Sequence, residues 1–458
     1  MPNWKVWLNI QLSSPLSTTH TTNFQHIGKN IWYEGSKKED ILKETIWKTE
    51  SITVIGNARI YNEASLWYMI GKTRNSTSTS TMEIIVELYK IYGFETALDY
   101  LDGDYAFVLM DYNIFGEEAR LYVAKDAFGL FPLYKLEYPD ITYKKVSFVP
   151  SEKNHVSEFV STATISEMKA SPLYIEIPSS PNGKPYANIY GFSSVNTSIE
   201  DASIESVPNG TYQVFTHSYK VSATWKTDGN ARIIYQLPFQ STYHWKQSGF
   251  SPPNIQKRLE EQIRVAVQKR AEWITEYQGK DHASIGLLKL SMGATFPKGF
   301  LQPISLETFM NIPFLEIKLH LFSSFDNLED LSKIESIHKI DSNVMGYLEE
   351  KYPSVLQEIK SKIDSNDPGI IRAHFIPAIV AKYIVEKYPE VKTIFMGEAF
   401  TYEYLEMNMF ERRKWMQNVY FLEKVRAWTE TFLSYGLDLY MPFLDRMLIQ
   451  TQDNYSRV

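Results

Sequence analysis

The reactive side chains of this chain are limited to oxygen and nitrogen groups, because its 458 residues include no cysteine. A thiolate nucleophile, a disulfide, a zinc thiolate site and an iron–sulfur cluster are therefore excluded. The 9 histidines show no HExxH spacing. Neither a GxSxG elbow nor a GxxxxGK[ST] loop occurs, so metalloprotease, serine-hydrolase and P-loop chemistry have no support. Acids, amides and short glycine-containing loops are the remaining candidates.

The composition is that of a globular protein with 44% hydrophobic and 22% charged residues, and the length suggests two or more domains. A net charge of -7 opposes nonspecific attraction to phosphate backbones, so direct nucleic-acid binding is not indicated. The first residues carry no basic segment followed by an apolar one, and no apolar run is long enough to span a bilayer. We expect an intracellular soluble protein without a membrane partner, cytoplasmic by default, with a virion an open alternative.

Short β-type segments separated by turn residues dominate the chain up to about residue 240. They are ITVIGNARIYN, DYAFVLMDYN, ARLYVAKDAFG, KKVSFVPSEK, PLYIEIPSSPNGKPY, PNGTYQVFTH and ARIIYQLPF. One helix is expected over 80–101, where apolar residues such as Ile84, Ile85 and Leu88 fall at helical spacing. This half is predicted to be a β-rich layered domain.

The hydrophobic period changes from two to 3.6 near residues 240–253, which places the domain boundary there. Beyond it we expect a long amphipathic helix over 255–277, further helices at 328–364 and 370–387, and helices to about Tyr435. Two buried strands are expected, one beginning at Ile285 and one at Thr393. Strands alternating with helices are typical of an α/β domain.

Four blocks of the first half, GNARIYNE, LDGDYAFVLMD, AKDAFGLFPLY and PSEK, occur in the order of the glutaminase domain of asparagine synthetases, which they resemble. In the second half RLEEQIRVAVQKR, NDPGIIRAHF, MGEAFTYEY and YGLDLYMPFLD are similar to motifs of the same family's synthetase domain. The resemblance implies an α+β N-terminal αββα sandwich of the N-terminal-nucleophile hydrolase type, a degenerate class II glutamine amidotransferase-like domain, over residues 1–245. An α/β adenine-nucleotide α-hydrolase-like domain, a degenerate ATP-pyrophosphatase domain truncated at its C-terminus, is implied over 246–458.

The resemblance also implies that the glutaminase groups have been replaced. Pro2 stands where the family has its catalytic cysteine, and Ile27 where an arginine holds the glutamine carboxylate. Asn57 retains the oxyanion-stabilising amide, but Arg59 stands where the family has a glutamate. Thr81 takes the place of the acid that holds the substrate ammonium. Apart from the remnant position Asn57, no catalytic glutaminase residue is expected.

The ATP–magnesium loop of the family is matched only in part by SMGATF at residues 291–296. Ser291 and Gly293 are retained as weak ATP-site remnants, whereas Met292 replaces a glycine that lets the backbone approach pyrophosphate. Thr295 replaces a metal-binding aspartate. We therefore expect no metal site and no bound cofactor.

Further remnants of the ATP site are Gly397, Glu398, Asp367 and Arg372. Glu398 is the second remnant catalytic position, although a solvated acid at a helix start explains it as well. Asp367 and Arg372 match the family's DxxTIRA segment, and PFLD at residues 442–445 is retained. We interpret both motifs as organising packing around the cleft.

Loss of charged and nucleophilic groups from both sites predicts an asparagine synthetase-like pseudoenzyme, a binding, regulatory or structural component of a larger assembly. Its partner would be an unidentified protein or ribonucleoprotein assembly, with a homodimer also expected from the resemblance. One alternative is an ammonia-dependent amide ligase that uses ATP and magnesium. A second is a nucleotide or amino-acid sensor without turnover.

Overall fold

The computed structural model forms two compact units, Met1–Tyr235 with Ile363–Ser365 and Gln236–Lys362 with Asn366–Val458. The domain limit expected after residue 245 lies outside the described residues. The structure describes residues 4–8, 11–12, 22–28, 31–36, 46–73, 80–114, 118–138, 146–150, 157–161, 174–176, 189–193, 203–218, 226–227, 232–233, 252–277, 285–291, 314–320, 353–363, 368–396 and 419–446.

The first unit is built on a seven-stranded antiparallel sheet. Its order is β16 (Lys226–Thr227), β15 (Thr211–Ser218), β8 (Glu118–Lys125), β7 (Gly103–Ile114), β6 (Ile52–Ile60) and β5 (Ile46–Lys48), and β17 (Arg232–Ile233) also pairs with β15. The strands expected in ITVIGNARIYN, DYAFVLMDYN, ARLYVAKDAFG and PNGTYQVFTH are confirmed as β6, β7, β8 and β15.

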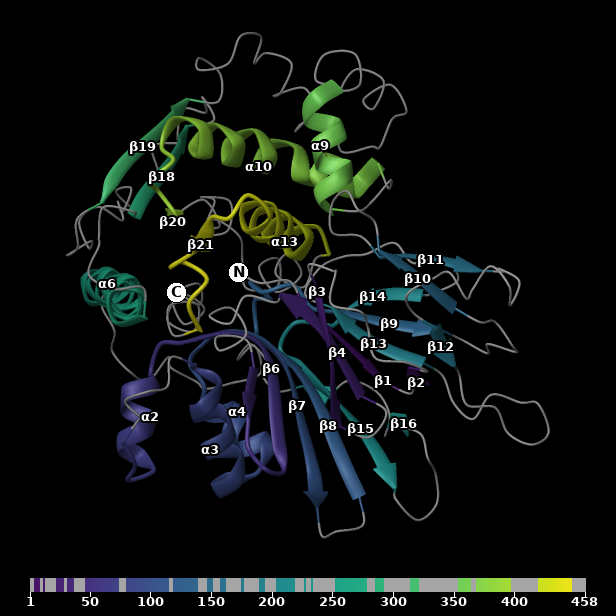
Figure 1. The fold of residues 1–458 in the computed structure, drawn as a ribbon. Helices are drawn as coiled ribbons and strands as arrows, with labels where there is room; N and C mark the ends of the chain where they lie inside the picture. The colour runs from purple at the N-terminus through teal and green to yellow at the C-terminus, as the bar shows by residue number, and fades with distance from the viewer. Residues whose placement is uncertain are drawn as a thin grey trace. The chain divides into compact units, whose positions relative to one another are not determined.

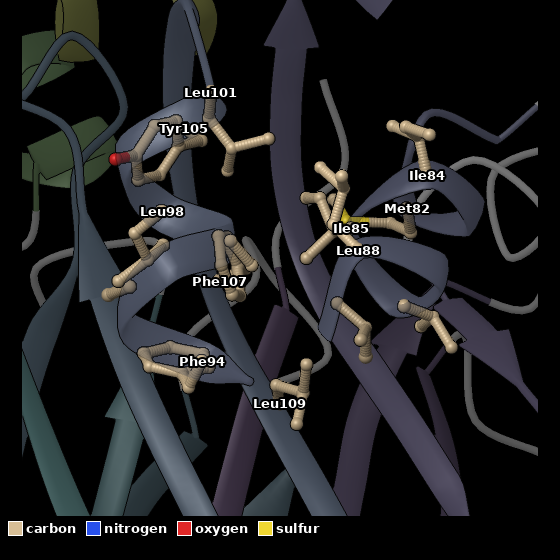
Figure 2. Close-up of a cluster of buried hydrophobic side chains, with 14 of the residues drawn as sticks. Met82, Ile84, Ile85, Leu88, Phe94, Leu98, Leu101, Tyr105, Phe107 and Leu109 are labelled. Carbon is tan, nitrogen blue, oxygen red and sulfur yellow. The ribbon is translucent and has the colours of Figure 1, made fainter. Parts of the chain in front are cut away.

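Three helices cover one face of this sheet (Figure 1): α2 (Glu63–Met69), α3 (Met82–Tyr92) and α4 (Phe94–Tyr100). Every second residue of the central strands, among them Phe107 and Leu109 of β7, packs with the helices in one buried cluster (Figure 2). The prediction of one helix over 80–101 is wrong at Gly93, where φ is 78° and the chain turns between α3 and α4. Helix α2 was not predicted from the sequence.

Two further antiparallel sheets lie in the first unit. One has the order β14 (Ser203–Ser206), β9 (Tyr134–Tyr138), β13 (Ile189–Ser193), β1 (Trp4–Leu8), β4 (Ile31–Ser36) and β3 (Thr22–Gly28). The other has the order β11 (Ser157–Ser161), β10 (Val146–Pro150), β12 (Tyr174–Glu176) and β2 (Gln11–Leu12). Lys125 of β8 points away from the helices and donates to Ser206 Oγ of β14 at 3.4 Å, so the helix-free face contacts the six-stranded sheet.

The second unit contains a four-stranded parallel sheet with the order β19 (Leu315–His320), β18 (Ile285–Ser291), β20 (Thr393–Met396) and β21 (Asp438–Tyr440). Its helices within the described ranges are α6 (Pro252–Tyr277), α9 (Pro353–Ile363), α10 (Pro368–Lys387) and α13 (Val419–Ser434). The two predicted strands are confirmed as β18 and β20, whereas β19 and β21 were not predicted. Within the part of the chain that the structure describes, no helix has the length and apolar character to cross a membrane.

Candidate functional site

Asn57, the retained amide, lies on β6 and is paired in register with Ala106 of β7. It is buried, with 6% of its surface exposed. Residues 52, 54 and 60 of β6 join the cluster beneath the helices, and alternation along a strand places Asn57 on the opposite face. Arg59 lies two residues further on and shares that face, so the sequence motif presents its polar residues away from the helix-covered core.

Arg59 is paired with Asp104, its direct neighbour across β6 and β7. Arg59 Nη1 lies 3.9 Å from Asp104 Oδ2, and the two side chains are only 2% and 3% exposed. The Tyr61 hydroxyl donates to the same carboxylate oxygen. The Arg59 guanidinium carbon also lies 4.8 Å from the centre of the Phe131 ring, a cation–π contact. A buried guanidinium needs such compensation because leaving it unpaired would cost several kcal/mol.

Asp126 holds the turn that follows β8. Its Oδ1 accepts the backbone N–H groups of Phe128 at 2.9 Å and Gly129 at 2.8 Å, and its Oδ2 accepts that of Tyr105 at 3.2 Å. Gly129 has φ 65°, a conformation that suits glycine. Burial, reinforced by the charge of Asp104, raises the pKa of Asp126 to about 7, although the two backbone donors and Lys125 act in the opposite direction.

Two buried cations and two buried carboxylates thus gather at one end of the seven-stranded sheet: Arg59, Lys125, Asp104 and Asp126. We call these four residues and Asn57 the inner-face cluster. Arg59 and Lys125 each have polar partners here, Asp104 and Ser206. The geometry suits a neutralised structural network, whereas glutamine hydrolysis needs a free nucleophile and a vacant carboxylate-binding cation.

Thr81 lies just before α3 and is buried, with 6% exposure. The neighbouring Ser80 Oγ accepts the backbone N–H of Met82 at 3.2 Å and so serves the first turn of the helix. A neutral hydroxyl at Thr81 lacks the charge needed to hold an ammonium group. Pro2 lies outside the described residues, and Ile27 falls at a register shift of β3 between His26 and Gly28.

In the second unit, Ser291 is the last residue of β18 and is paired in register with His320 of β19. Leu288 pairs with Met396, the last residue of β20, so the two parallel strands end at the same edge of the sheet. Ligands of open α/β sheets bind outside the carboxyl ends of the strands. The retained Gly397 and Glu398 follow β20 in the sequence but lie outside the described residues, as do Gly293 and Asp367.

Arg372 lies within α10, and its side chain is outside the described part of the structure. Within the described ranges no group of three or more His, Asp or Glu side chains has a geometry that could hold a metal ion. Of the six weak ATP-site remnants, only Ser291 and Arg372 are therefore located, both through the backbone.

The retained PFLD segment follows β21 and forms a buried ion-pair network. Asp445 Oδ2 accepts hydrogen bonds from Arg270 Nη1 at 2.9 Å and Lys269 Nζ at 2.6 Å, both on α6. Arg270 also donates to its own helix at Ala266 O, 2.8 Å away. Burial alone would raise the pKa of Asp445, but the two cations outweigh it and hold that pKa below its ordinary value. The PFLD segment is thereby attached to α6.

A second buried polar contact joins α10 to α13. His374 Nε2 lies 3.1 Å from Glu430 Oε2, and Arg426 Nε lies 3.8 Å from the other Glu430 oxygen. The sequence analysis missed this contact and also missed Asp104, Lys125 and Asp126 of the inner-face cluster. The sequence offered a sign of the role of Asp104, because this charged residue directly precedes the apolar run of β7, and a buried charge needs a partner.

The chain was compared with known proteins. Residues 43–153 match the model of a glutamine amidotransferase domain family, a segment that contains the whole inner-face cluster. The chain is also similar to the chicken (Gallus gallus) protein named asparagine synthetase [glutamine-hydrolyzing], with 25% identity over 405 residues. The match covers 85% of this chain and 62% of the chicken protein, so this chain spans less than two thirds of that relative's length.

Proposed function

This chain is an asparagine synthetase-like protein, and on that premise we propose that it is a pseudoenzyme, a binding, regulatory or structural component that does not hydrolyse glutamine. The printed name of the chicken relative states glutamine hydrolysis for that protein. The same scaffold can carry different functions, so the activity must be judged from the site residues of this chain.

The observation that carries the proposal is the buried pair between Arg59 and Asp104. The resemblance assigns a glutamate to position 59, whereas here a guanidinium is 3.9 Å from Asp104 and stacked on Phe131. Opening such a pair for a substrate would leave a buried charge uncompensated, at a cost of about 3–5 kcal/mol. The pair therefore favours a closed, structural use of the former substrate region.

The absence of cysteine from the 458 residues supports the same conclusion. The family's reaction needs a thiolate that attacks the glutamine amide. Asn57 retains the side chain that could stabilise an oxyanion, but stabilisation without a nucleophile gives no acyl-enzyme. The neutral Thr81 adds a third lost function, the capture of the substrate ammonium.

For the finer architecture we propose an αββα sandwich in the first unit and an ATP-pyrophosphatase-type domain in the second. Support for the first comes from helices on one face of the seven-stranded sheet and the contact between Lys125 and Ser206 on the other. Support for the second comes from the parallel order β19, β18, β20 and β21. We further propose a cytoplasmic location and a protein or ribonucleoprotein partner or a second copy of the chain.

The competing function is an ammonia-dependent, ATP-using amide ligase. It is favoured by the buried attachment of Asp445 to Arg270, which keeps α6 and the segment after β21 together in the synthetase half. Ser291, Gly397 and Glu398 would then contact ATP, and magnesium would supply charge neutralisation of its phosphates. Under the pseudoenzyme proposal these residues do not take part in the turnover of a nucleotide.

The decisive measurement is pyrophosphate release by the purified chain with ATP–magnesium, aspartate and either glutamine or ammonium, beside the chicken relative as a positive control. We expect no release with either nitrogen source and no glutamate formed from glutamine. Release with ammonium alone would establish the ligase. Glutamate formation would overturn the proposal about the first unit. Native mass spectrometry of the chain isolated from its own cells would then identify the stoichiometric partner.

A further inference from the structure

A hollow in the first unit lies far from the inner-face cluster. It has a volume of about 830 Å³ and is lined by the end of α3, the start of α4 and the strands β7, β8 and β15. Asp111, which lines it, pairs with Ile52 at one end of β6 and β7, whereas Asp104 pairs with Arg59 near the other end. The two aspartates are seven positions apart along the strand, a span of roughly 23 Å. Asp111 also lies on the helix side of the sheet, because its hydroxyl partner Tyr89 belongs to α3.

Aromatic rings form much of the wall. Phe94 stacks on Tyr122 with ring centres 4.2 Å apart, and Tyr89 meets Tyr122 edge to face at 5.7 Å. Tyr212 tilts against Phe94 at 5.5 Å. Phe94 belongs to the buried cluster drawn in Figure 2, and with Tyr122 and Tyr212 of the same cluster it also lines the hollow. Phe94, Tyr122 and Tyr212 are at most 8% exposed and form a rigid floor, whereas Tyr89 and Tyr92 are partly exposed and can contact a ligand at little entropic cost.

Each basic residue of the wall is paired with a carboxylate of the wall or next to it. Arg232 Nη1 lies 3.3 Å from Glu95 Oε1, and Arg120 Nη2 lies 3.4 Å from Glu118 Oε2. Lys90 Nζ is bonded to Glu87 at 2.7 Å. The two carboxylates that line the hollow also accept hydrogen bonds from tyrosine hydroxyls. Asp111 accepts one from Tyr89 at 2.7 Å, and Glu95 accepts one from Tyr212. An anionic ligand would have to displace a carboxylate from its basic partner, and a cationic ligand would meet three basic side chains of the wall.

We propose that this hollow binds a neutral, hydroxyl-rich ligand of the carbohydrate class. Sugar hydroxyls can both donate to the carboxylates of Asp111 and Glu95 and accept from the guanidinium of Arg232. They therefore form hydrogen bonds with the charged wall residues without adding a charge to the hollow. The apolar C–H face of a sugar ring packs on an aromatic ring such as that of the partly exposed Tyr92. The volume falls within the range of small-molecule sites.

The site is independent of the amide chemistry considered above. It shares the seven-stranded sheet with the inner-face cluster but lies on the other face and at the other end. Binding of a glycan there would give the first unit a recognition role even where both family reactions are lost. The test is therefore a binding measurement and needs no turnover.

The experiment is a glycan array probed with the labelled full chain, followed by calorimetry on the best neutral glycan. Thr96 is exposed and lines the hollow, and its replacement by Trp should fill the mouth of the hollow. Asp99 is exposed on the same helix but lies outside the hollow, so Asp99→Trp is the matched control. We expect T96W to weaken binding about tenfold or more and D99W to change it less than about twofold. Glu95→Gln should also weaken binding about tenfold, because a charged acceptor is lost.

Equal melting temperatures of the three variants would show that the fold is retained. The proposal is overturned if no neutral glycan binds, or if T96W and D99W bind a glycan equally well. It is also overturned if choline or inorganic phosphate competes with the glycan on the wild type but fails to bind T96W, because the hollow would then select a charged ligand.

Discussion

Arg270 of α6 donates to the carboxylate of Asp445 at 2.9 Å across 175 positions of sequence. Both side chains are almost fully buried, at 1% and 3% exposure. The guanidinium thus ties the helix that opens the second unit to the segment that follows its last described strand. This contact couples two short segments that are far apart in the sequence.

Removing the Asp445 carboxylate should destabilise the second unit strongly. Asp445→Ala leaves Arg270 and Lys269 without their shared anion, and we expect a loss of about 3–5 kcal/mol in the free energy of unfolding. Urea denaturation followed by circular dichroism measures it. Arg264→Ala is the control, because Arg264 makes an exposed pair with Glu261 on the same helix. Equal midpoints for the two variants would contradict a structural role for the buried pair.

The same carboxylate should give the second unit an acid-sensitive stability. The pKa of Asp445 is lowered in the folded chain, where the two cations overcome the effect of burial, from an ordinary value of 3.8. The stabilisation is therefore present above pH 3.8 and is lost as the pH falls through the depressed pKa. Thermal melts at decreasing pH should show this loss in the wild type, and the slope should flatten in Asp445→Asn.

The pair between Arg59 and Asp104 should show strong coupling in a double-mutant cycle. Asp104→Leu alone strands a buried guanidinium and is expected to cost about 3–5 kcal/mol in the free energy of unfolding, measured by urea denaturation beside Arg59→Met alone. The double variant Arg59→Met with Asp104→Leu should recover most of that loss, because apolar side chains need no charged partner at this site. Additive effects of the two single changes would show that the pair is not an energetic unit.

Asp126 should make the first unit less stable as the pH rises toward neutrality. Its pKa is raised from 3.8 to about 7, first by burial and then by Asp104. The folded state therefore retains a proton that the unfolded state has lost, and the associated stability is complete below pH 3.8 and lost as the pH rises through about 7. In Asp126→Asn this decline should disappear, although the new amide N–H₂ meets the backbone donor of Tyr105 and lowers stability at every pH. Melting temperatures between those limits measure both effects, and an unchanged slope would contradict the assignment.

Two glycines of the first unit should respond differently to alanine. Gly93 has φ 78° and ψ 173°, and no atom lies within 4 Å of the position that its Cβ would take. Gly93→Ala should therefore cost only the backbone strain, about 1–3 kcal/mol. At Gly103 a Cβ would lie 2.0 Å from Arg59 O across the sheet. Gly103→Ala should thus separate β6 from β7 and lower the melting temperature much further than Gly93→Ala does.

The strand and helix predictions succeeded where the hydrophobic period was regular. The buried run TIFM became β20, and the alternation of ITVIGNARI became β6. The predictions failed at Gly93, since the apolar spacing continues through a residue whose backbone leaves the helix. They also missed β21, three residues long, because so short a strand is defined by pairing with β20 rather than by its own composition.

The sequence by itself determined the loss of the thiol nucleophile, the placement of Asn57 in a glutaminase-like motif and the change from a β-rich half to an α/β half, because these depend on residue type and on local period. Only the tertiary structure decided that Arg59 meets Asp104 and that Arg270 meets Asp445. The hollow between α4 and the sheet likewise follows from the tertiary structure. Each of these contacts joins residues from different elements, and its energy depends on burial and distance, which local patterns do not encode.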